Sequence, residues 1–589
     1  MLRRMSRRLN VRLVLTCALA GLFCGSFTFW ASCPRVRSGA PDPDMVDEDG
    51  EDPPVKTARD IKGNQVHVEG DCKNLPCIIN GEDSIMCRAS EDEVFVPFTF
   101  LSQYFEVEGK LRGGETDPHF EWIHAPKKGL YEPQEPYDPK GAFGWFSNYN
   151  VEVRDRVKCI SALHDVPVST QWSSSGYLYP IQIAQYALSH FSKNLTDPGP
   201  RITVVADSDQ VIGQWKISPN SFVQRIYDKQ LSTNIVEFHV SKEGGMELHL
   251  PGKPAELVLG MDLNLEGEGK ITVAVKDEDG PEVFQLHYET SRDLLTVESE
   301  KEGIVYGLRI GSGWRRFVRD LFFDLQKGLA VMEGKRRKRM TRSRLTPLSI
   351  SFVGKGHVDN VTLSTTDHVT LFFQGADWFV SSQDQDSGGW PVPVERRLAQ
   401  RQLILKPGWH SAMAQGQALS VLARAFHASK NEKYLDAALK GVNPFRVNSS
   451  DGGVRTYFLD KFVFYEEYPT VPSSFVLNGF IYSLLGLFDL ASILGPTHPS
   501  HESVNHLYQE GLTSLLALLP LYDTGSGSVY DLRHFTLGGG PPPNLARWDY
   551  HVTHINQLRL LATIEEHPIL SSTAERWFSY MNGHRAPHN

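Results

Sequence analysis

The sequence has no excess of positive charge, because its 60 Lys and Arg residues are outnumbered by 70 Asp and Glu, giving a formal net charge of −10. Nucleic-acid-binding proteins are usually basic, so that class is disfavoured and any anionic ligand must be held by local arginines. The sequence also lacks a Gly-x-Ser-x-Gly elbow and a distinctive zinc motif. Serine-hydrolase chemistry therefore has no supporting motif, and metal catalysis has very little support.

Disorder and low complexity are excluded as descriptions of the whole chain. Hydrophobic residues make up 41% of its 589 residues and charged residues 22%, with 31 Phe, 20 Tyr and 11 Trp. This composition supports large buried cores and argues against a collagen-like chain or a coiled coil. The length leaves room for roughly three or four domains.

The N-terminus predicts a membrane anchor. Five arginines within residues 1–12 form a cytoplasmic tail, and they precede an uncharged run at 13–31. Nineteen helical residues span roughly 28 Å, close to the thickness of a hydrocarbon core. The run is longer than a usual signal-peptide core and no convincing cleavage site follows, so a retained signal-anchor is favoured over a cleaved signal. The remainder would then face a lumen.

Potential glycosylation sites and cysteines beyond the span agree with a luminal orientation. Sequons at Asn194, Asn360 and Asn448 are potential glycosylation sites. Four cysteines beyond the span are candidates for disulfides in an oxidising lumen, but the sequence leaves their pairing open. They are Cys72, Cys77, Cys87 and Cys159.

The pattern of residues predicts a multidomain α+β protein. Residues 32–70 are rich in Pro, Asp, Glu and Gly and indicate a flexible stem. Residues 71–200 contain short aromatic runs with period-two alternation, typical of a β-rich domain, and 201–365 alternate more cleanly, as in a β-sandwich. From 366 to 589 the period becomes helical.

The helical part predicts an (α/α) toroid, which explains its aromatic connecting loops better than an ordinary bundle does. Ser411 is expected to cap a helix at 412–429, and Ser473 and Ser474 to open an apolar helix reaching 493. Further helices are expected near 502–518 and 553–581.

Three polar and aromatic segments beside helix-connecting loops are the candidates for chemistry. They are Tyr465-Glu-Glu-Tyr-Pro469, Tyr530-Asp-Leu-Arg-His534 and Asn544-Leu-Ala-Arg-Trp-Asp-Tyr-His551. A free phenol titrates near 10, but a neighbouring Arg favours the phenolate. One such Tyr can remove a weakly acidic proton while a second returns one, and Arg can hold a carboxylate. The set therefore suits proton abstraction α to a carboxylate.

Other interpretations remain open for these residues and for a run of basic residues. The tyrosines could simply be hydrogen-bonded residues in the core of a loop. His551 and His554 have the spacing of metal ligands, but a zinc site normally needs a third protein ligand. Glu466 or Glu467 could form a glycosidase acid/base pair with Asp549. The run Lys335-Arg-Arg-Lys-Arg339 suits an acidic polysaccharide, a protease-sensitive loop or a solvated loop.

The three segments, together with Asn150-Val-Glu-Val-Arg-Asp-Arg-Val-Lys-Cys159, Tyr179-Pro-Ile-Gln-Ile-Ala-Gln185 and Ala412-Met-Ala-Gln-Gly-Gln417, resemble the D-glucuronyl C5-epimerase (heparosan-N-sulfate-glucuronate 5-epimerase) family over roughly residues 71–589. The resemblance implies a homodimeric, single-pass type II Golgi membrane enzyme of heparan sulfate and heparin biosynthesis. Its activity would be conversion of D-glucuronate to L-iduronate in N-sulfated heparosan, without an organic cofactor. Other enzymes of the same biosynthesis would be possible partners, but nucleic acid would not.

The resemblance also implies roles for particular residues. The catalytic set is Tyr468, Tyr530, Tyr550 and Glu467. The N-terminal contribution to substrate binding, with the partner subunit as one source, is Tyr149, Arg154, Asp155, Gln171, Tyr179 and Gln182. The helical contribution is Arg397, Gln400, Asn478, Tyr482, Arg533, Asn544, Arg547, Trp548, Asp549, His551 and Thr553. A structural Ca²⁺ is implied at Asp207, Asp209, Thr233, Asn234 and Asp359.

Two departures from the family pattern are the long loop at 538–543 and His410, where an aromatic residue is expected. Two rival functions also remain. A polysaccharide lyase would begin with the same proton abstraction, and a non-catalytic glycan-binding Golgi protein would use the basic run.

Overall fold

The computed structural model describes residues 73–79, 83–90, 93–98, 100, 107–112, 119–124, 129–209, 215–252, 255–297, 303–309, 311, 313–333, 340–399 and 402–587. The predicted tail, membrane anchor and stem lie outside these residues, as do Cys72, Gln400 and the basic run at 335–339. Among the described helices, α8 (Leu477–Leu494) is long and apolar enough to cross a membrane, but it is mostly buried inside the protein, as a core helix is.

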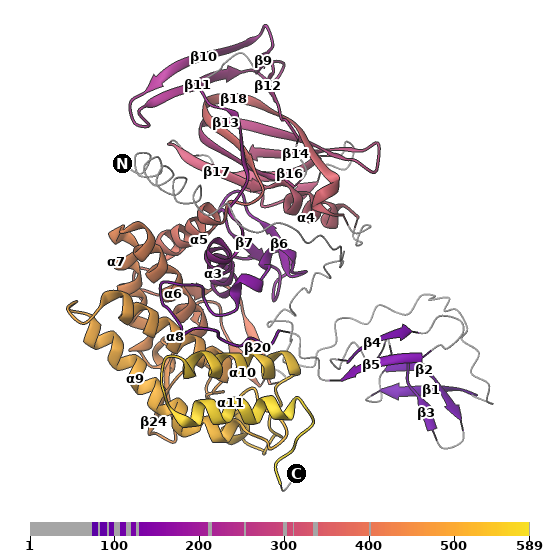
Figure 1. Ribbon diagram of the computed structural model, residues 1–589, viewed down its shortest axis with the longest axis vertical. Coiled ribbons are helices and arrows are strands. Elements are labelled where there is room, and N and C mark those ends of the chain that lie inside the picture. The colour runs from indigo at the N-terminus through magenta and orange to yellow at the C-terminus, as the bar shows by residue number, and fades with distance from the viewer. Residues whose placement is uncertain are drawn as a thin grey trace, which may run out of the picture. The chain divides into compact units, whose positions relative to one another are not determined.

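The first described strands form two small antiparallel sheets (Figure 1). One has the order β1-β2-β3 (Lys73–Ile79, Asp83–Ser90, Glu93–Phe95), and the other pairs β4 (Val107–Arg112) with β5 (His119–His124). A disulfide between Cys77 and Cys87 joins β1 to β2, while Cys159 is a buried free thiol. The structure thus supplies a pairing that the sequence left open.

The strands expected between 201 and 365 form an eleven-stranded sheet with a main path β10-β11-β18-β13-β14-β16-β15. Two twenty-residue strands, β13 (Val258–Asp277) and β18 (Leu345–Ser364), pair along most of their lengths and lie at its centre. Alternate residues such as Ile271, Val273 and Val275 are fully buried, which is the period-two pattern that the sequence showed. The other strands are β8 (Ile202–Ala206), β9 (Trp215–Ile217), β10 (Ser221–Asp228), β11 (Thr233–Val240), β12 (Met246–His249), β14 (Val283–Thr290), β15 (Thr296–Val297), β16 (Gly303–Leu308) and β17 (Arg315–Asp320).

Two helices lie in regions where only strands were expected. Helix α4 (Leu321–Glu333) packs against the large sheet, and α3 (Pro180–Thr196) belongs to the stretch assigned to a β-rich domain. Residues 180–193 of α3 are all buried, so polar residues such as Gln182, Gln185 and His190 face protein rather than solvent. Pro180 at its first turn was the available helix signal. The same stretch contains the short pair β6 (Val157–Ile160) and β7 (Pro167–Ser169).

Four helix pairs make up the helical region: α3 with α5, α6 with α7, α8 with α9, and α10 with α11. Helix α6 also packs against α3 and α8, and α8 packs against α10. Gly416 and Gly486 permit the α6–α8 contact, since a Cβ on Gly486 would overlap the backbone of Gly416. The remaining bounds are α5 His368–Ser382, α6 Ala412–Ser429, α7 Glu432–Gly441, α9 His501–Leu518, α10 Trp548–Ala562 and α11 Pro568–Tyr580.

Short two-stranded pairs connect these helices, and one expected helix start is displaced. The pairs are β19 (Pro391–Val392) with β22 (Trp409–His410), β20 (Arg396–Leu398) with β21 (Leu403–Leu405), and β23 (Arg455–Phe458) with β24 (Phe462–Tyr465). Ser411 caps α6 as predicted, accepting a hydrogen bond from the Ala414 amide. Helix α8 begins at Leu477 rather than at Ser473 or Ser474, because the Ser474 hydroxyl donates to Glu466 instead of capping the helix.

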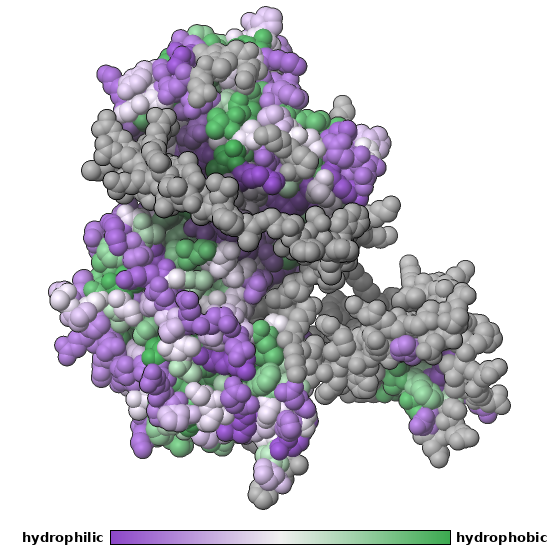
Figure 2. Space-filling view, viewed as in Figure 1, coloured by the Kyte–Doolittle hydropathy of each residue, from purple (hydrophilic) through white to green (hydrophobic). Residues whose placement is uncertain are grey.

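The segment 129–149 connects all four helix pairs by hydrogen bonds. These are Phe143 N to Ser192 Oγ on α3, Arg424 Nε on α6 to Gly141 O, Tyr137 Oη to Asp489 Oδ1 on α8, and Tyr131 N to Asn556 Oδ1 on α10. Arg424 and Asp489 also form an ion pair of 2.6 Å with both side chains fully buried. One segment of the chain therefore bonds to a helix of each pair. On the face shown in Figure 2, apolar residues form small separate groups within a largely hydrophilic surface.

Candidate active site

The first candidate segment is fixed to the starts of two helices through Glu466. The carbonyl of Glu466 accepts from the Ala412 amide at the start of α6, with N and O 2.9 Å apart. Its fully buried carboxyl accepts from Phe475 N at 3.1 Å and Ser474 Oγ at 3.2 Å, just before α8. This carboxyl therefore orders the backbone that leads into α8, with Glu467 and Tyr468 following directly.

Glu467 and Tyr468 lie against different walls of the site. Glu467 is buried over the first turn of α8, where a Cβ on Gly479 would overlap its side chain, so only glycine fits beneath it. The Tyr468 ring, 6% exposed, has its centroid 5.8 Å from that of Trp409. Glu467 and Tyr468 thus place one carboxylate and one phenol near the N-terminal ends of α6 and α8.

The second and third tyrosines are in direct contact. The rings of Tyr530 and Tyr550 meet edge to face with centroids 4.7 Å apart, and both residues are buried. The Tyr530 carbonyl accepts from Leu477 N, the first residue of α8, at 3.1 Å, while its amide donates to Asn544 O at 2.7 Å. All three candidate segments therefore lie around the N-terminal end of α8.

Two of the predicted substrate residues lie on α8 itself, four positions apart. Asn478 is 3% exposed, and the structure gives its Oδ1 no hydrogen-bond partner among the described residues, although its backbone carbonyl accepts from Gln557 Nε2 at 2.9 Å. Tyr482 packs against Phe143, Trp145 and Phe146. A buried amide oxygen next to the tyrosine segments is suited to receive a donor from a ligand.

Arg533 and Asn544 share one buried carboxylate that sequence reasoning missed. Asp531 is 1% exposed; its Oδ2 accepts from Asn544 Nδ2 at 3.0 Å and lies 3.4 Å from Arg533 Nε. Burial raises the pKa of Asp531, and the Arg533 guanidinium opposes that rise. Arg547, which is more exposed, lies 3.8 Å from Asp549 Oδ1. Each arginine named as an anion binder is thus accompanied by an acidic neighbour.

His551 is enclosed by protein on both sides of its ring. Its Nδ1 lies 3.2 Å from the Ser528 amide and 2.8 Å from the Ser528 hydroxyl, and its Nε2 lies 3.0 Å from Trp577 O. Burial lowers the pKa of His551 to about 4, so it is neutral at pH 7. The ring therefore fixes α10 against its neighbours. His554, whose pKa burial also lowers, shares the Ser528 hydroxyl, and the described residues contain no group of three metal-ligating His, Cys, Asp or Glu side chains.

Two further residues in the third segment support the turn into α10. The Thr553 hydroxyl donates to the Asp549 carbonyl at 2.9 Å, one helical turn back. The Trp548 ring lies with its centroid 5.7 Å from that of His551. Both contacts hold the first turn of α10, which carries Tyr550.

Some of the predicted N-terminal residues lie close to α8 within this chain. Tyr149 stacks on Phe146 at 4.3 Å, and Arg154 lies over the Tyr149 ring and donates to Gln185 Oε1 at 2.6 Å. Phe146 in turn contacts Tyr482, so this group reaches α8. Tyr179 precedes α3 and lies 5.1 Å from Trp172, ring centroid to ring centroid.

The other predicted N-terminal residues differ in burial. The Gln182 amide and Gln171 Oε1 are buried without a hydrogen-bond partner among the described residues, whereas Asp155 is exposed. Arg397 is also largely exposed and ion-paired with Glu395 at 2.6 Å, so the structure places it on the outside of β20. His410, a departure from the family pattern, is buried between Ser387 and the Gly452 carbonyl.

Comparison with known proteins identifies the family. Residues 383–579 match the family described as D-glucuronyl C5-epimerase C-terminus, and residues 232–355 match the D-glucuronyl C5-epimerase beta-sandwich domain. The chain is also 39% identical over 559 residues to the D-glucuronyl C5-epimerase of Caenorhabditis elegans, covering 87% of this chain and 89% of that protein. The chain belongs to the D-glucuronyl C5-epimerase family. It is an epimerase, and the resemblance noted in its motifs is confirmed.

Two weaker likenesses add little to the D-glucuronyl C5-epimerase assignment. An uncharacterized protein of Methanocaldococcus jannaschii is 32% identical over 160 residues, covering 27% of this chain and 47% of that protein. A family 11 carbohydrate-binding module of Clostridium thermocellum covers 28% of this chain and 95% of its own, at 14% identity and a TM-score of 0.18. Nothing is inferred from a likeness at that score.

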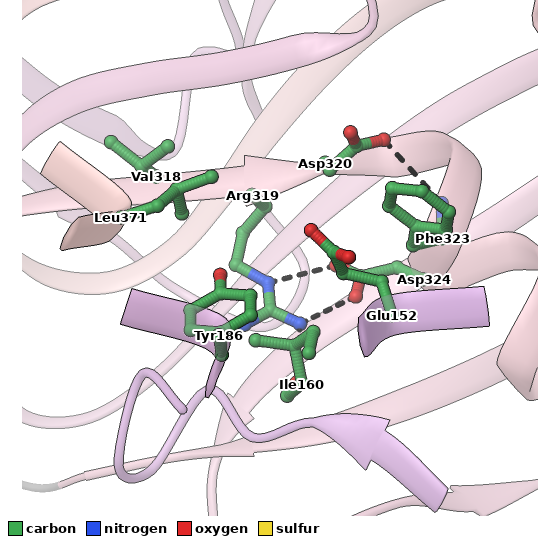
Figure 3. A pocket seen from close by; sticks show the side chains of 9 residues that line it. All are labelled: Glu152, Ile160, Tyr186, Val318, Arg319, Asp320, Phe323, Asp324 and Leu371. Carbon is green, nitrogen blue, oxygen red and sulfur yellow. Dashed lines mark hydrogen bonds and ion pairs between the residues drawn. The ribbon is translucent and has the colours of Figure 1, made fainter. Parts of the chain in front are cut away.

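A small cavity lies apart from the tyrosines, where α3 and α5 meet β17 and α4 (Figure 3). Arg319 and Asp324 pair within it, both 2% exposed, and Glu152 and Tyr186 line the same space. Burial would raise the pKa of Glu152, but Lys193 and His190 hold it well below its usual value. These charges are internally compensated, which fits a structural role in joining the helical part to the large sheet.

The Glu466 carboxyl has a consequence for stability that can be measured. Burial raises the pKa of Glu466 to about 8, well above the usual range of a glutamate side chain. The native state thus keeps a proton that the unfolded chain releases near pH 4.5, so this contribution to stability is complete below that pH and is lost as the pH rises through 8. In Glu466→Gln, the free energy of unfolding should fall less steeply with rising pH than in wild type, by up to about 1.4 kcal/mol per pH unit. Urea unfolding between pH 5 and 8 measures it.

The matched control is Glu432→Gln, which changes an exposed carboxylate at the start of α7. This variant should keep the wild-type dependence on pH. Parallel curves for wild type and Glu466→Gln would contradict a raised pKa at Glu466.

Proposed function

We propose that this epimerase inverts C5 of D-glucuronate residues in N-sulfated heparosan to give L-iduronate, in the biosynthesis of heparan sulfate and heparin. The observation that carries the proposal is the gathering of three tyrosine segments at the N-terminal end of α8, with Tyr530 and Tyr550 in ring contact. The family assignment supports a glycosaminoglycan substrate. No organic cofactor is needed for this chemistry.

The reaction we propose uses two tyrosines on opposite faces of the sugar ring. A phenolate on one face removes the C5 proton, which leaves an enolate-like carboxylate group stabilised by Arg533 or Arg547. A neutral tyrosine on the other face then returns a proton to C5, which inverts its configuration. Tyr468 would face Tyr530 or Tyr550, since the latter two share one side of the site. Glu467, buried beside Tyr468, would orient the substrate or its hydroxyl groups.

We further propose that the four helix pairs form an (α/α) toroid whose open end binds the polymer. The order of contacts α3–α6–α8–α10 and the segment 129–149 that bonds to each pair support a closed ring. Tyr179, Asn478 and Trp548 lie at the N-terminal ends of α3, α8 and α10. Helix N-termini carry partial positive charge, which suits a substrate rich in carboxylate and sulfate.

Incubation of the purified chain with N-sulfated heparosan in D₂O tests the reaction. The wild type should incorporate deuterium at C5 and produce iduronate, as followed by NMR. Tyr468→Phe should lower the rate by about 100- to 10,000-fold with little change in polymer affinity, because only the proton-transfer group is removed. Tyr457→Phe, at an exposed ring on β23, is the control and should leave the rate unchanged.

Other outcomes of that assay would support a rival function. Ultraviolet absorbance from a 4,5-unsaturated uronate would indicate elimination and hence a lyase. Polymer binding without any exchange at C5 would indicate a glycan-binding protein.

We also propose a single-pass type II Golgi membrane protein with a luminal catalytic part that forms a homodimer. Asn194 and Asn448 are exposed, whereas the Asn360 amide is half-buried and donates to Asp262 Oδ2 at 3.3 Å. A glycan on Asn360 would have to fit beside that contact, so we expect this site to stay unmodified.

Glycosylation of the secretory-pathway protein checks the orientation. Enzymatic deglycosylation should remove two glycans, and Asn194→Gln and Asn448→Gln should each remove one, as judged by electrophoretic mobility. Asn360→Gln should change nothing. An unmodified chain in the membrane fraction would argue for the reverse orientation.

Finally, we propose a structural Ca²⁺ beside β11 and β18. Asp209 accepts from Thr233 Oγ1 at 3.0 Å and Asn234 Nδ2 at 2.7 Å, and Asp359 accepts from Ser208 N at 3.0 Å. Asp207 accepts from the Asp209 amide. These side chains all offer oxygen atoms, which Ca²⁺ prefers as ligands. Since no three carboxylates converge among the described residues, backbone, hydroxyl or amide oxygens would complete the coordination.

Calcium removal tests this site through stability. Ca²⁺ added to EGTA-treated protein should raise the melting temperature, since a ligand at 100 times its Kd stabilises by about 2.7 kcal/mol, and Mg²⁺ should not. Asp209→Asn should abolish the gain, while Asp436→Asn, on the exposed side of α7, should retain it. Equal melting temperatures with Ca²⁺ and with EGTA would refute the proposal.

A further inference from the structure

Two adjacent arginines on the short strand β20 differ sharply in environment. Arg396 is 6% exposed, whereas the side chain of Arg397 is 49% exposed and paired with Glu395. Strand alternation explains the difference, since successive side chains point to opposite faces. Pairing of Arg396 with Leu405 on β21 fixes that register. The inward-facing arginine is therefore Arg396.

The Arg396 guanidinium lies between two aromatic rings, one of which belongs to a candidate catalytic residue. Its Cζ is 4.8 Å from the Trp172 ring centroid and 5.8 Å from the Tyr468 ring centroid. Trp409 completes the cluster, with its ring 6.1 Å from Trp172 and 5.8 Å from Tyr468. The Trp409 indole is itself anchored by donating to Val394 O at 3.0 Å. Tyr468 thus contacts a rigid assembly that contains one permanent cation.

We propose that Arg396 is a positioning residue for Tyr468, holding its ring and placing a fixed positive charge beside the phenol that exchanges a proton with C5. This inference rests on the proposed function. A cation over an aromatic face is attracted by the ring, and the attraction is stronger in a desolvated site. A nearby positive charge also stabilises the anionic form of the phenol. Arg396 therefore acts through Tyr468, which distinguishes it from Arg533 and Arg547 as proposed holders of the substrate carboxylate.

The planar shape of arginine matters for this role. A guanidinium stacks on aromatic rings and remains charged when buried, whereas the ammonium of lysine is compact and strongly hydrated. Lysine at position 396 would keep the charge but lose the fit between Trp172 and Tyr468. Methionine would keep most of the side-chain length and lose the charge. The two variants therefore separate the contributions of charge and shape.

The experiment compares Arg396→Lys and Arg396→Met with wild type in the full-length chain, using N-sulfated heparosan in D₂O. Arg446→Gln, at an exposed arginine that bonds Asn443 and Ser503, is the control. Three quantities are measured: kcat, KM, and the ratio of C5 deuterium in uronate of retained configuration to that in uronate of inverted configuration. The ratio is independent of how much of the enzyme is folded.

Arg396→Met should lower kcat by about 30-fold, as expected for loss of a buried cation–π contact, and change KM by less than about threefold. It should also shift the ratio, because only the tyrosine on one face loses its charged neighbour. Arg396→Lys should restore part of kcat and return the ratio toward wild type. Arg446→Gln should match wild type throughout.

Two results would overturn the inference while leaving the proposed function intact. A lower kcat with an unchanged ratio in both Arg396 variants would mean that Arg396 serves the fold alone. A rise in KM with kcat preserved would make Arg396 a substrate-binding group. Failure of the wild type itself to exchange C5 hydrogen would instead refute the proposed function, and with it the role of Arg396.

Discussion

The start of α8 is the constraint on which the rest of the site depends. Its first amide bonds to the carbonyl of Tyr530, the loop before it is held by the carboxyl of Glu466, and its first turn leaves room for Glu467 only because residue 479 is glycine. One helix end therefore sets the positions of two loops that are distant in sequence. These contacts combine backbone groups with the side chains of Glu466 and Glu467.

Burial of polar groups around this helix end is extensive but largely compensated. Asp531 is shared by Arg533 and Asn544, and both nitrogens of His551 meet protein groups. The amide atoms of Asn478 and Gln182 are the contrast, since part of their hydrogen-bonding capacity is unused within the described structure. Unsatisfied buried amides are costly in a folded protein, so their presence fits a site completed by a hydroxylated ligand or water.

Sequence alone predicted the parts of this molecule that local pattern controls. Period-two alternation identified the strands around 201–365, and Ser411 was correctly identified as the cap of α6. Where tertiary contacts override local signals, prediction failed. Ser474 does not cap α8 because its hydroxyl donates to Glu466. Helix α3 was not predicted, and its first fourteen residues are buried by contacts that form only on folding.

Candidate residues followed the same rule. The tyrosine segments were identifiable from composition and motif, but Asp531 and Glu466 acquire their significance only from the carboxyl contacts made after folding. The family resemblance named Arg397, whose role stays a prediction, but nothing in the letters Arg-Arg tells which of the two arginines faces inward. Strand register decides that question, and register is a property of pairing rather than of composition.

The hydrogen bond between Tyr131 and Asn556 spans 425 positions of the chain. Residues 129–149 are synthesised long before α10 and α11, so they emerge well ahead of the last helices that they bond. The bond between Tyr131 and Asn556 therefore cannot form until α10 has been synthesised. Long-range contacts of this kind slow folding and lengthen the time for which apolar surface is exposed in the nascent chain.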